Sequence, residues 1–402
     1  MGKVWIPASA GMSGWRGFVL FRGFLHTLVR GNERRWSSIT NYKGDNDPMP
    51  QDALVTSAIA HWAPRFVANG VTLTDFEEVT ASVSSWDDWC RAWSARAATH
   101  EALGHDALAR GKLLSAGEHL QRAGVYYHFG KFLFVHDIPQ MKAAHAKAVA
   151  CRAQALPHLQ PPGERVEVPY QGRRLAGILR KPAGIERPPV VVMAMGLDSA
   201  KEEADCYEQP FLARRMATLS FDGPGQGEAE YDFAIRGDYE VAVAAVIDFV
   251  ARRRDLDSAR IGLWGVSMGG YYAPRAAAFE RRARACIALG GPFDWVAAWD
   301  SLPQLTRDAF RVRSHCANED AARRHAATLS LDGIAHQITC PIYVMNGRQD
   351  RLVPSADAER LAREVKGPVT LHLIEGGNHI ATNRAYRWRS DSADWMAEQL
   401  RA

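Results

Sequence analysis

The sequence lacks any run of about 18 apolar residues, the length that a membrane-spanning helix requires, so no membrane span is predicted. It also lacks a marked charge excess: 49 Lys and Arg residues stand against 45 Asp and Glu residues, a formal net charge of +4. The basic residues are scattered along the chain, so no nucleic-acid partner is predicted. No internal repeat or low-complexity tract is evident, which excludes a repeat architecture.

Cysteine is sparse and shows no metal-binding or redox pattern. The six cysteines lie far apart without a C-x-x-C pair, and several stand in apolar runs such as 285–289. This favours reduced, buried thiols in a cytoplasmic protein over disulfide bonds. His100 and His105 flank a segment similar to the zinc motif H-E-x-x-H, but they stand five residues apart instead of four and would not share a helix face. Neither a metal site nor a cofactor is predicted.

Residues 1–45 are predicted to be a disordered extension. The stretch 15–30 is apolar and basic, but Arg22 interrupts it too early for a secretory signal. The alternative is a membrane-surface helix with a basic stripe of Arg22, His26 and Arg30, although glycines weaken such a helix.

Residues 46–160 are predicted to form a helical cap domain, and residues 161–402 an α/β catalytic domain. Up to Pro157, apolar residues recur at helical spacing, and Ser84-Ser85 is suited to cap a helix that begins at Trp86. Beyond Pro161, a hairpin pattern around Gln171-Gly172 is followed by continuous apolar runs that alternate with helical stretches. This alternation predicts a doubly wound, mostly parallel sheet.

The most informative motif is Gly265-Val266-Ser267-Met268-Gly269, which fits the G-x-S-x-G nucleophile elbow. The elbow places a serine hydroxyl on a strained turn between a strand and a helix. Residues 260–264 read as that strand and residues 270–279 as that helix. Ser267 is therefore the predicted nucleophile.

Two partners follow Ser267 in the order that α/β-hydrolases use. Asp350 and His379 each come shortly after a predicted strand, 342–345 and 369–374 respectively. His379 would take the proton of Ser267 and deliver it to the leaving group, while Asp350 would hold the imidazole tautomer. The alternative makes Asp350 a turn residue and His379 a loop residue, but the carboxyl ends of parallel strands are where such sites are built.

An oxyanion hole needs the N–H after the nucleophile and a second N–H from the loop after an earlier strand. Met268 supplies the first, and Leu197, which follows the strand 190–195, supplies the second. The Gly-rich segment 222–228 also follows a strand, but Pro224 lacks the N–H that a phosphate cradle would use. We interpret this segment as a tight structural turn.

Together these segments resemble the α/β-hydrolase family that includes 2,6-dihydroxypseudooxynicotine hydrolase and the fungal polyketide-shortening hydrolases. The resemblance covers residues 50–400 and rests on the segments 196–203, 221–228 and 237–240 together with the elbow. It implies an α/β-hydrolase fold with a helical cap, a cofactor-free Ser/Asp/His site and a homodimer acting on a small molecule. Several members cleave carbon–carbon bonds of β-diketone-like or polyketide substrates, and others are esterases.

Carbon–carbon hydrolysis expels a carbon leaving group, which must be polarised or protonated. His379 is the default acid. Asp300, where the resemblance places an extra acidic residue, is an auxiliary candidate, with Asp294 as its rival and helix capping as the alternative role. The run Lys201-Glu202-Glu203 would be able to order the oxyanion loop, but a solvated charge run is the favoured interpretation.

Most aromatic residues of the predicted cap are expected in its core, while Tyr126, Tyr127 and His128 are candidates for a substrate pocket between cap and sheet. The leading hypothesis is a serine hydrolase that cleaves a carbon–carbon bond in an aromatic or polyketide 1,3-diketone-like substrate through an acyl-enzyme. A carboxylesterase with the same triad is the first alternative, and a non-catalytic hydrolase-like binding protein is the second.

Overall fold

An eight-stranded sheet organises the second part of the chain in the computed structural model, which describes residues 51–401. The strand order is β1-β2-β4-β3-β5-β6-β7-β8; β2 pairs antiparallel with β1 and β4, and the other pairs are parallel. The strands are β1 (Gly163–Tyr170), β2 (Arg173–Arg180), β3 (Pro189–Ala194), β4 (Ala217–Phe221), β5 (Asp257–Val266), β6 (Ala283–Leu289), β7 (Ile342–Gly347) and β8 (Val369–Ile374). The predicted hairpin and mostly parallel sheet are confirmed.

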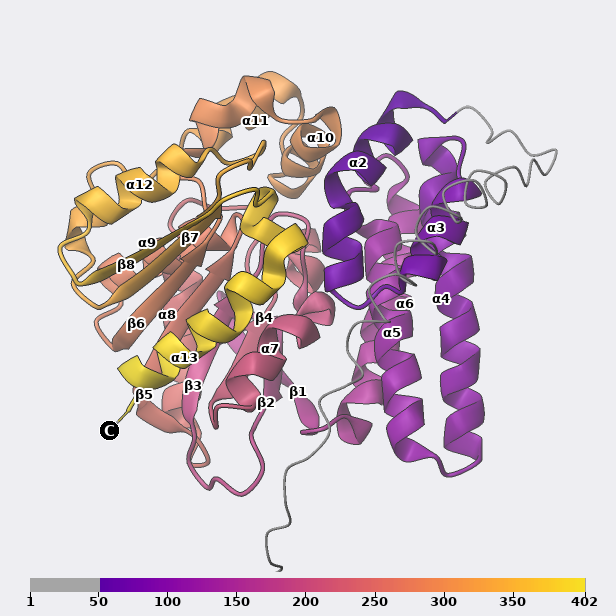
Figure 1. Cartoon of the computed structure of the whole chain (residues 1–402), viewed down its shortest axis with the longest axis horizontal. Coiled ribbons are helices and arrows are strands. Elements are labelled where there is room, and N and C mark those ends of the chain that lie inside the picture. The colour runs from indigo at the N-terminus through magenta and orange to yellow at the C-terminus, as the bar shows by residue number, and fades with distance from the viewer. Residues whose placement is uncertain (1–50, 402) are drawn as a thin grey trace, which may run out of the picture. The chain divides into compact units, whose positions relative to one another are not determined.

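Helices cover both faces of this sheet, which is why its central strands are apolar on both sides. Along β3, Val190 and Val192 belong to one buried cluster, whereas Val191 and Met193 belong to another that includes residues of α7 and α13. Figure 1 shows α7 and α13 crossing one face, with α8 and α9 behind the strands. The helices of this part are α7 (Asp205–Leu212), α8 (Glu240–Arg252), α9 (Gly269–Phe279), α10 (Gln304–Arg313), α11 (Glu319–Ala326), α12 (Ser355–Glu364) and α13 (Arg389–Gln399).

The residues before the sheet are helical, as their apolar spacing predicts. The helices are α2 (Ala53–Ala68), α3 (Leu73–Ala81), α4 (Trp86–Ala109), α5 (Leu113–Lys131) and α6 (Ile138–Ala155). The side chain of Ser85 accepts a hydrogen bond from Asp87 N–H and caps α4, as expected. These helices, called the helical region below, lie beside the sheet in one compact unit (Figure 1). The division into domains at residue 160 stays a prediction.

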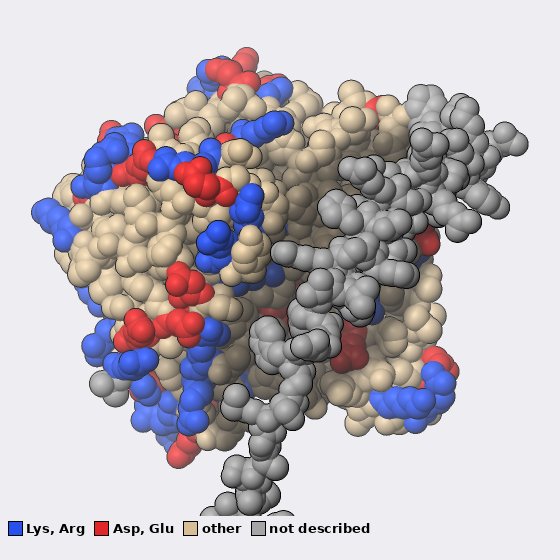
Figure 2. All heavy atoms as spheres, in the orientation of Figure 1, with Lys and Arg blue, Asp and Glu red and all other residues tan. Residues whose placement is uncertain are grey.

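The predicted extension, residues 1–45, lies outside the described residues. Within residues 51–401 no helix is long and apolar enough to cross a membrane. All six cysteines are free, and three of them, Cys90, Cys151 and Cys286, are buried. Figure 2 shows basic and acidic side chains interspersed on the visible face, in keeping with the near-balanced composition.

Candidate active site

The turn between β5 and α9 holds Ser267 in a strained backbone conformation. Its φ angle is 57°, in the left-handed region that non-glycine residues seldom adopt. The flanking glycines are sterically required, because a Cβ on Gly265 would collide with the carbonyl of Gly269, and a Cβ on Gly269 with the carbonyl of Ala194. The G-x-S-x-G spacing therefore follows from the close approach of α9 to β3 and β5, and it leaves the half-buried Ser267 at the end of the sheet.

The three predicted triad side chains meet at this edge. His379 Nε2 lies 2.9 Å from Ser267 Oγ, and His379 Nδ1 lies 2.8 Å from Asp350 Oδ2. The other carboxylate oxygen of Asp350 accepts hydrogen bonds from the N–H groups of Leu352 and Val353, at 2.8 and 3.0 Å. With Asp350 accepting from Nδ1–H, the Nε2 atom is free to accept the Ser267 proton.

The two predicted oxyanion donors flank Ser267. Among the described residues, neither Met268 N–H nor Leu197 N–H has a hydrogen-bond acceptor. The loop that carries Leu197 approaches the elbow so closely that a Cβ on Gly196 would lie 3.0 Å from the Cβ of Ser267. Two unpaired N–H groups beside a candidate nucleophile are the arrangement that binds a developing oxyanion.

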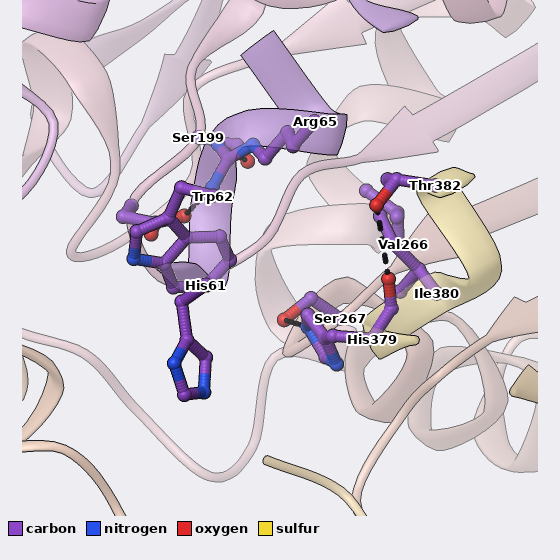
Figure 3. A pocket seen from close by; sticks show the side chains of 10 residues that line it. His61, Trp62, Arg65, Ser199, Val266, Ser267, His379, Ile380 and Thr382 are labelled. Carbon is purple, nitrogen blue, oxygen red and sulfur yellow. Dashed lines mark hydrogen bonds and ion pairs between the residues drawn. The ribbon is translucent and has the colours of Figure 1, made fainter. Parts of the chain in front are cut away.

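A narrow pocket, partly open to solvent, lies beside Ser267. Figure 3 shows residues of α2 on one side of it, and Ser267 with the segment that begins at His379 on the other. The Trp62 ring meets the His379 ring edge-on, with centroids 6.1 Å apart. Burial, reinforced by His379 and Arg351, lowers the pKa of His61, so this imidazole is neutral near pH 7. The lining residues are His61, Trp62, Arg65, Asp198, Ser199, Val266, Ser267, His379, Ile380 and Thr382.

Arg65 joins α2 to the segment that follows the oxyanion loop. Its guanidinium donates to both carboxylate oxygens of Glu203, at 2.8 and 2.6 Å, to Asp198 at 2.8 Å and to Ser199 at 2.8 Å. All four residues are buried. A bidentate Arg–carboxylate pair of this kind fixes geometry as well as charge.

The expectation of a solvated charge run at Lys201-Glu202-Glu203 is wrong, because each of these residues is only 1% exposed. Glu203 pairs with Arg65, and Lys201 Nζ lies 2.6 Å from Glu202 and 2.7 Å from Asp222. Burial would lower the pKa of Lys201, but these carboxylates outweigh it and raise the pKa instead. The charges are tolerated in the interior because each faces an opposite charge.

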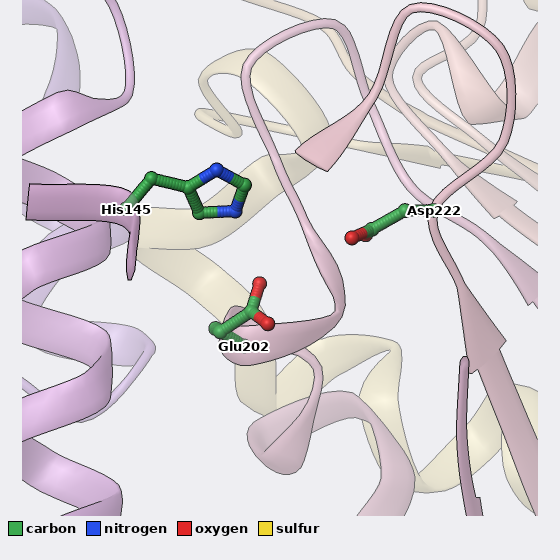
Figure 4. A group of neighbouring side chains, drawn as sticks. All are labelled: His145, Glu202 and Asp222. Atoms are coloured by element: carbon green, nitrogen blue, oxygen red, sulfur yellow. The ribbon is translucent and has the colours of Figure 1, made fainter. Parts of the chain in front are cut away.

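His145, Glu202 and Asp222 point toward a shared buried space, as Figure 4 shows, and their ligand atoms lie within 4.8 Å of one another. This geometry alone would suit a divalent cation. The ammonium of Lys201, however, already contacts both carboxylates of the group. We therefore interpret Lys201 as the cation of this cluster.

The structure does not bring Tyr126, Tyr127 or His128 to the pocket lining, which corrects that expectation. Their polar atoms are turned to other partners: Tyr126 Oη donates to Asp75 at 2.7 Å, Tyr127 Oη donates to Glu101 at 2.7 Å, and His128 Nε2 lies 3.2 Å from Glu203. All three side chains are buried within the helical region or at its contact with the sheet. They serve packing and hydrogen bonding there.

Asp300 and Asp294 also lie outside the pocket lining. The Asp300 side chain is 75% exposed and pairs with Arg323 on the surface. Asp294 accepts a hydrogen bond from Val296 N–H at 3.2 Å and caps the short helix η4 (Trp295–Ser301), which is the capping role weighed as the alternative. Neither carboxyl group is placed to assist Ser267.

Sequence reasoning missed the contribution of α2 to the pocket. Its signal is a lone charged residue, Arg65, within a mostly apolar helix, since an arginine on the buried face of such a helix needs a buried partner. Which partner it finds is not encoded nearby, because Glu203 is 138 residues away.

Comparison with known proteins identifies the class and then the family. The crystal structure of 2,6-dihydroxy-pseudo-oxynicotine hydrolase superposes with a TM-score of 0.77 at 33% identity, covering 84% of this chain and 95% of that one. With its doubly wound sheet and nucleophile elbow, the chain is an α/β-hydrolase, an enzyme of that class. The family model described as Esterase FrsA-like matches residues 74–396, and the chain belongs to this family.

Two relatives show how far the similarity extends. The 2,6-dihydropseudooxynicotine hydrolase of Paenarthrobacter nicotinovorans is 33% identical over 360 residues, which covers 87% of this chain and 93% of the relative. The hydrolyase poxO of Penicillium oxalicum is 35% identical over 231 residues, and this match spans only about half of either protein, 53%. The predicted family is confirmed, while the homodimer stays a prediction.

Proposed function

We propose that the protein hydrolyses its substrate through Ser267, His379 and Asp350 by way of an acyl-enzyme. The observation that carries this proposal is the pair of contacts of the His379 ring, 2.9 Å to Ser267 Oγ and 2.8 Å to Asp350 Oδ2. His379 takes the serine proton as Oγ attacks the substrate carbonyl, and Asp350 stabilises the resulting imidazolium. The N–H groups of Leu197 and Met268 receive the negative oxygen.

The same imidazole then completes the reaction. His379 donates its proton to the leaving group as the tetrahedral intermediate collapses to the acyl-enzyme. A water molecule, deprotonated by His379, attacks the acyl-enzyme and releases the acid. Each proton that His379 takes is returned, so the cycle regenerates the starting state.

The substrate class we favour is an aromatic or polyketide 1,3-diketone-like compound cleaved at a carbon–carbon bond. A carbon leaving group departs readily only when a second carbonyl accepts the electron pair as an enolate, which a 1,3-diketone provides. The relative that matches 87% of this chain is named a hydrolase of 2,6-dihydropseudooxynicotine, which supports the proposal of a small-molecule substrate. Trp62, at the pocket and against His379, offers an aromatic surface to such a substrate.

A carboxylesterase is the second candidate, because the family description names an esterase and an ester uses the same nucleophile and oxyanion donors. In either case we propose that the helical region acts as the cap. Its helix α2 contributes His61, Trp62 and Arg65 to the pocket, opposite Ser267 and the segment that begins at His379. Substrate choice would then rest on α2.

The test is a paired assay of wild type and Ser267→Ala with p-nitrophenyl esters and aryl 1,3-diketones, with products identified by mass spectrometry. We expect diketone cleavage to an acid and a ketone, and a fall in kcat of about 10⁵- to 10⁶-fold in Ser267→Ala. Ser301→Ala, a change at an exposed serine of η4, serves as the matched control. Ester turnover without diketone cleavage would select the carboxylesterase, and turnover that survives in Ser267→Ala would refute the triad.

A further inference from the structure

The loop 222–228, expected to be a simple tight turn, places a buried amide against the oxyanion loop. Gln226 is 1% exposed, and its Nε2 donates to the carbonyl of Met195 at 2.5 Å and to the carbonyl of Gly196 at 2.9 Å. The next carbonyl, that of Leu197, accepts from Arg313 at 2.5 Å. Side chains from distant parts of the chain therefore bind the carbonyls of three consecutive residues, Met195, Gly196 and Leu197. The last of these is the predicted oxyanion donor.

The hold on the carbonyl of Gly196 sets the direction of the Leu197 N–H. Both groups belong to one peptide unit, and a trans peptide points its C=O and N–H in opposite directions. The cis peptide of the described residues is at Gln160-Pro161, so this unit is trans. Because Gln226 binds the carbonyl, the N–H is turned to the opposite side of the peptide, and it has no acceptor among residues 51–401.

The Gln226 amide is itself fixed. Its Oε1 accepts from Tyr239 Oη at 2.5 Å and from Gly223 N–H at 3.3 Å. A flipped amide would set its N–H₂ against these donors and its oxygen against two carbonyls, so one orientation is compatible with the surroundings. Tyr239 is held by stacking on Tyr272 of α9, with ring centroids 3.7 Å apart.

Two other residues of the loop 222–228, Gly223 and Asp222, support this arrangement. A side chain at Gly223 would collide with the Tyr239 hydroxyl, so glycine lets that hydroxyl reach Gln226. Asp222 accepts from the backbone N–H of Lys201 at 3.0 Å and so ties the loop to the far end of the oxyanion segment. The loop is thus hydrogen-bonded to both ends of the segment 195–201.

We propose that Gln226 is a positioning residue of the oxyanion hole, which aims the Leu197 N–H at the substrate oxygen, and that Tyr239 orients Gln226. This inference rests on the proposed function, because an aimed N–H matters only if Ser267 forms a tetrahedral intermediate. Removing an oxyanion donor lowers kcat by about 10²- to 10³-fold. A donor that is misaimed rather than removed should lower it by about 10- to 100-fold.

The test compares wild type with Gln226→Met, which keeps the side-chain length but removes the donors, and with Tyr239→Phe, which keeps the stacking but removes the hydroxyl. Gln154→Met, at an exposed glutamine of α6, is the matched control. Active sites are counted by reaction with a fluorophosphonate, and kcat for a p-nitrophenyl ester is expressed per labelled site. Misfolding lowers the number of labelled sites, whereas a misaimed donor lowers the turnover of each site.

We expect per-site kcat to fall about 10- to 100-fold in Gln226→Met and about 3- to 10-fold in Tyr239→Phe, with an unchanged pH profile because the triad is untouched. Tyr239→Phe should add nothing in the Gln226→Met background. Per-site kcat within 2-fold of wild type in both variants would overturn the inference alone. A wild type that neither reacts with the fluorophosphonate nor depends on Ser267 would instead overturn the proposed function.

Discussion

Replacing Arg65 with methionine should destabilise the protein severely. The change keeps most of the aliphatic stem, but it removes every hydrogen bond of the guanidinium. It also removes the contacts of the guanidinium with the rings of Trp62, Phe129 and Phe132. Asp198 and Glu203 then remain in the interior, with side chains 8% and 0% exposed, without the cation that neutralises them. Burial raises the pKa of Glu203, and the interaction with Arg65 helps to hold that pKa well below its usual range, so the substitution removes a partner that stabilises the charged carboxylate.

The magnitude follows from the number of partners that are stranded. Breaking one buried ion pair by removing a single partner costs about 3–5 kcal/mol. Here one substitution strands two carboxylates, but Glu203 keeps Asn69 and His128 as partners. We expect a loss of about 4–5 kcal/mol in the free energy of unfolding, a large part of the roughly 5–15 kcal/mol that stabilises most proteins.

Urea unfolding at neutral pH is the assay, and Arg91→Met is the matched control. The Arg91 side chain is 73% exposed and pairs with Asp88 at the surface of α4, so its loss should cost less than about 1 kcal/mol. The double variant Arg65→Met/Glu203→Met should lose about 1–3 kcal/mol less than the sum of the single changes, because it leaves no unpaired carboxylate at residue 203. An Arg65→Met variant as stable as Arg91→Met, or strictly additive changes, would refute the reasoning.

Two further predictions concern the triad and the buried charge cluster. Asp350→Asn should lower kcat by about 10⁴-fold by favouring the wrong tautomer of His379, whereas Asp300→Asn should leave kcat unchanged; equal effects in steady-state assays would contradict this. Burial, together with Lys131 and Lys201, lowers the pKa of His145 well below its usual value. As the pH falls through about 6.5, this imidazole therefore binds a proton in the unfolded chain but not in the folded protein. Stability should therefore fall as the pH drops below about 6.5, and His145→Gln should reduce that slope by up to about 1.4 kcal/mol per pH unit. Parallel slopes in urea titrations between about pH 7 and 5 would argue against a neutral His145.

The sequence by itself determined the class of fold and the location of the candidate nucleophile. Apolar runs that alternate with helical spacing are local patterns, and the carboxyl ends of parallel strands must meet at one edge of a sheet. For this reason Ser267, Asp350 and His379 could be brought together without a structure. The glycines of the elbow carry the same kind of local information, since α9 cannot approach the sheet if either bears a side chain.

Only the tertiary structure decided which polar residues are buried and what they contact. The sequence Lys201-Glu202-Glu203 does not indicate whether these residues face water or buried partners. The partner of Glu203, Arg65, lies 138 residues away. Asp300 was expected at the site from the family resemblance, and Tyr126, Tyr127 and His128 from their side-chain chemistry, but the contacts of these residues lie elsewhere. Long-range pairing sets the free energy of a buried charge, and the path of the chain in space decides which pairs can form.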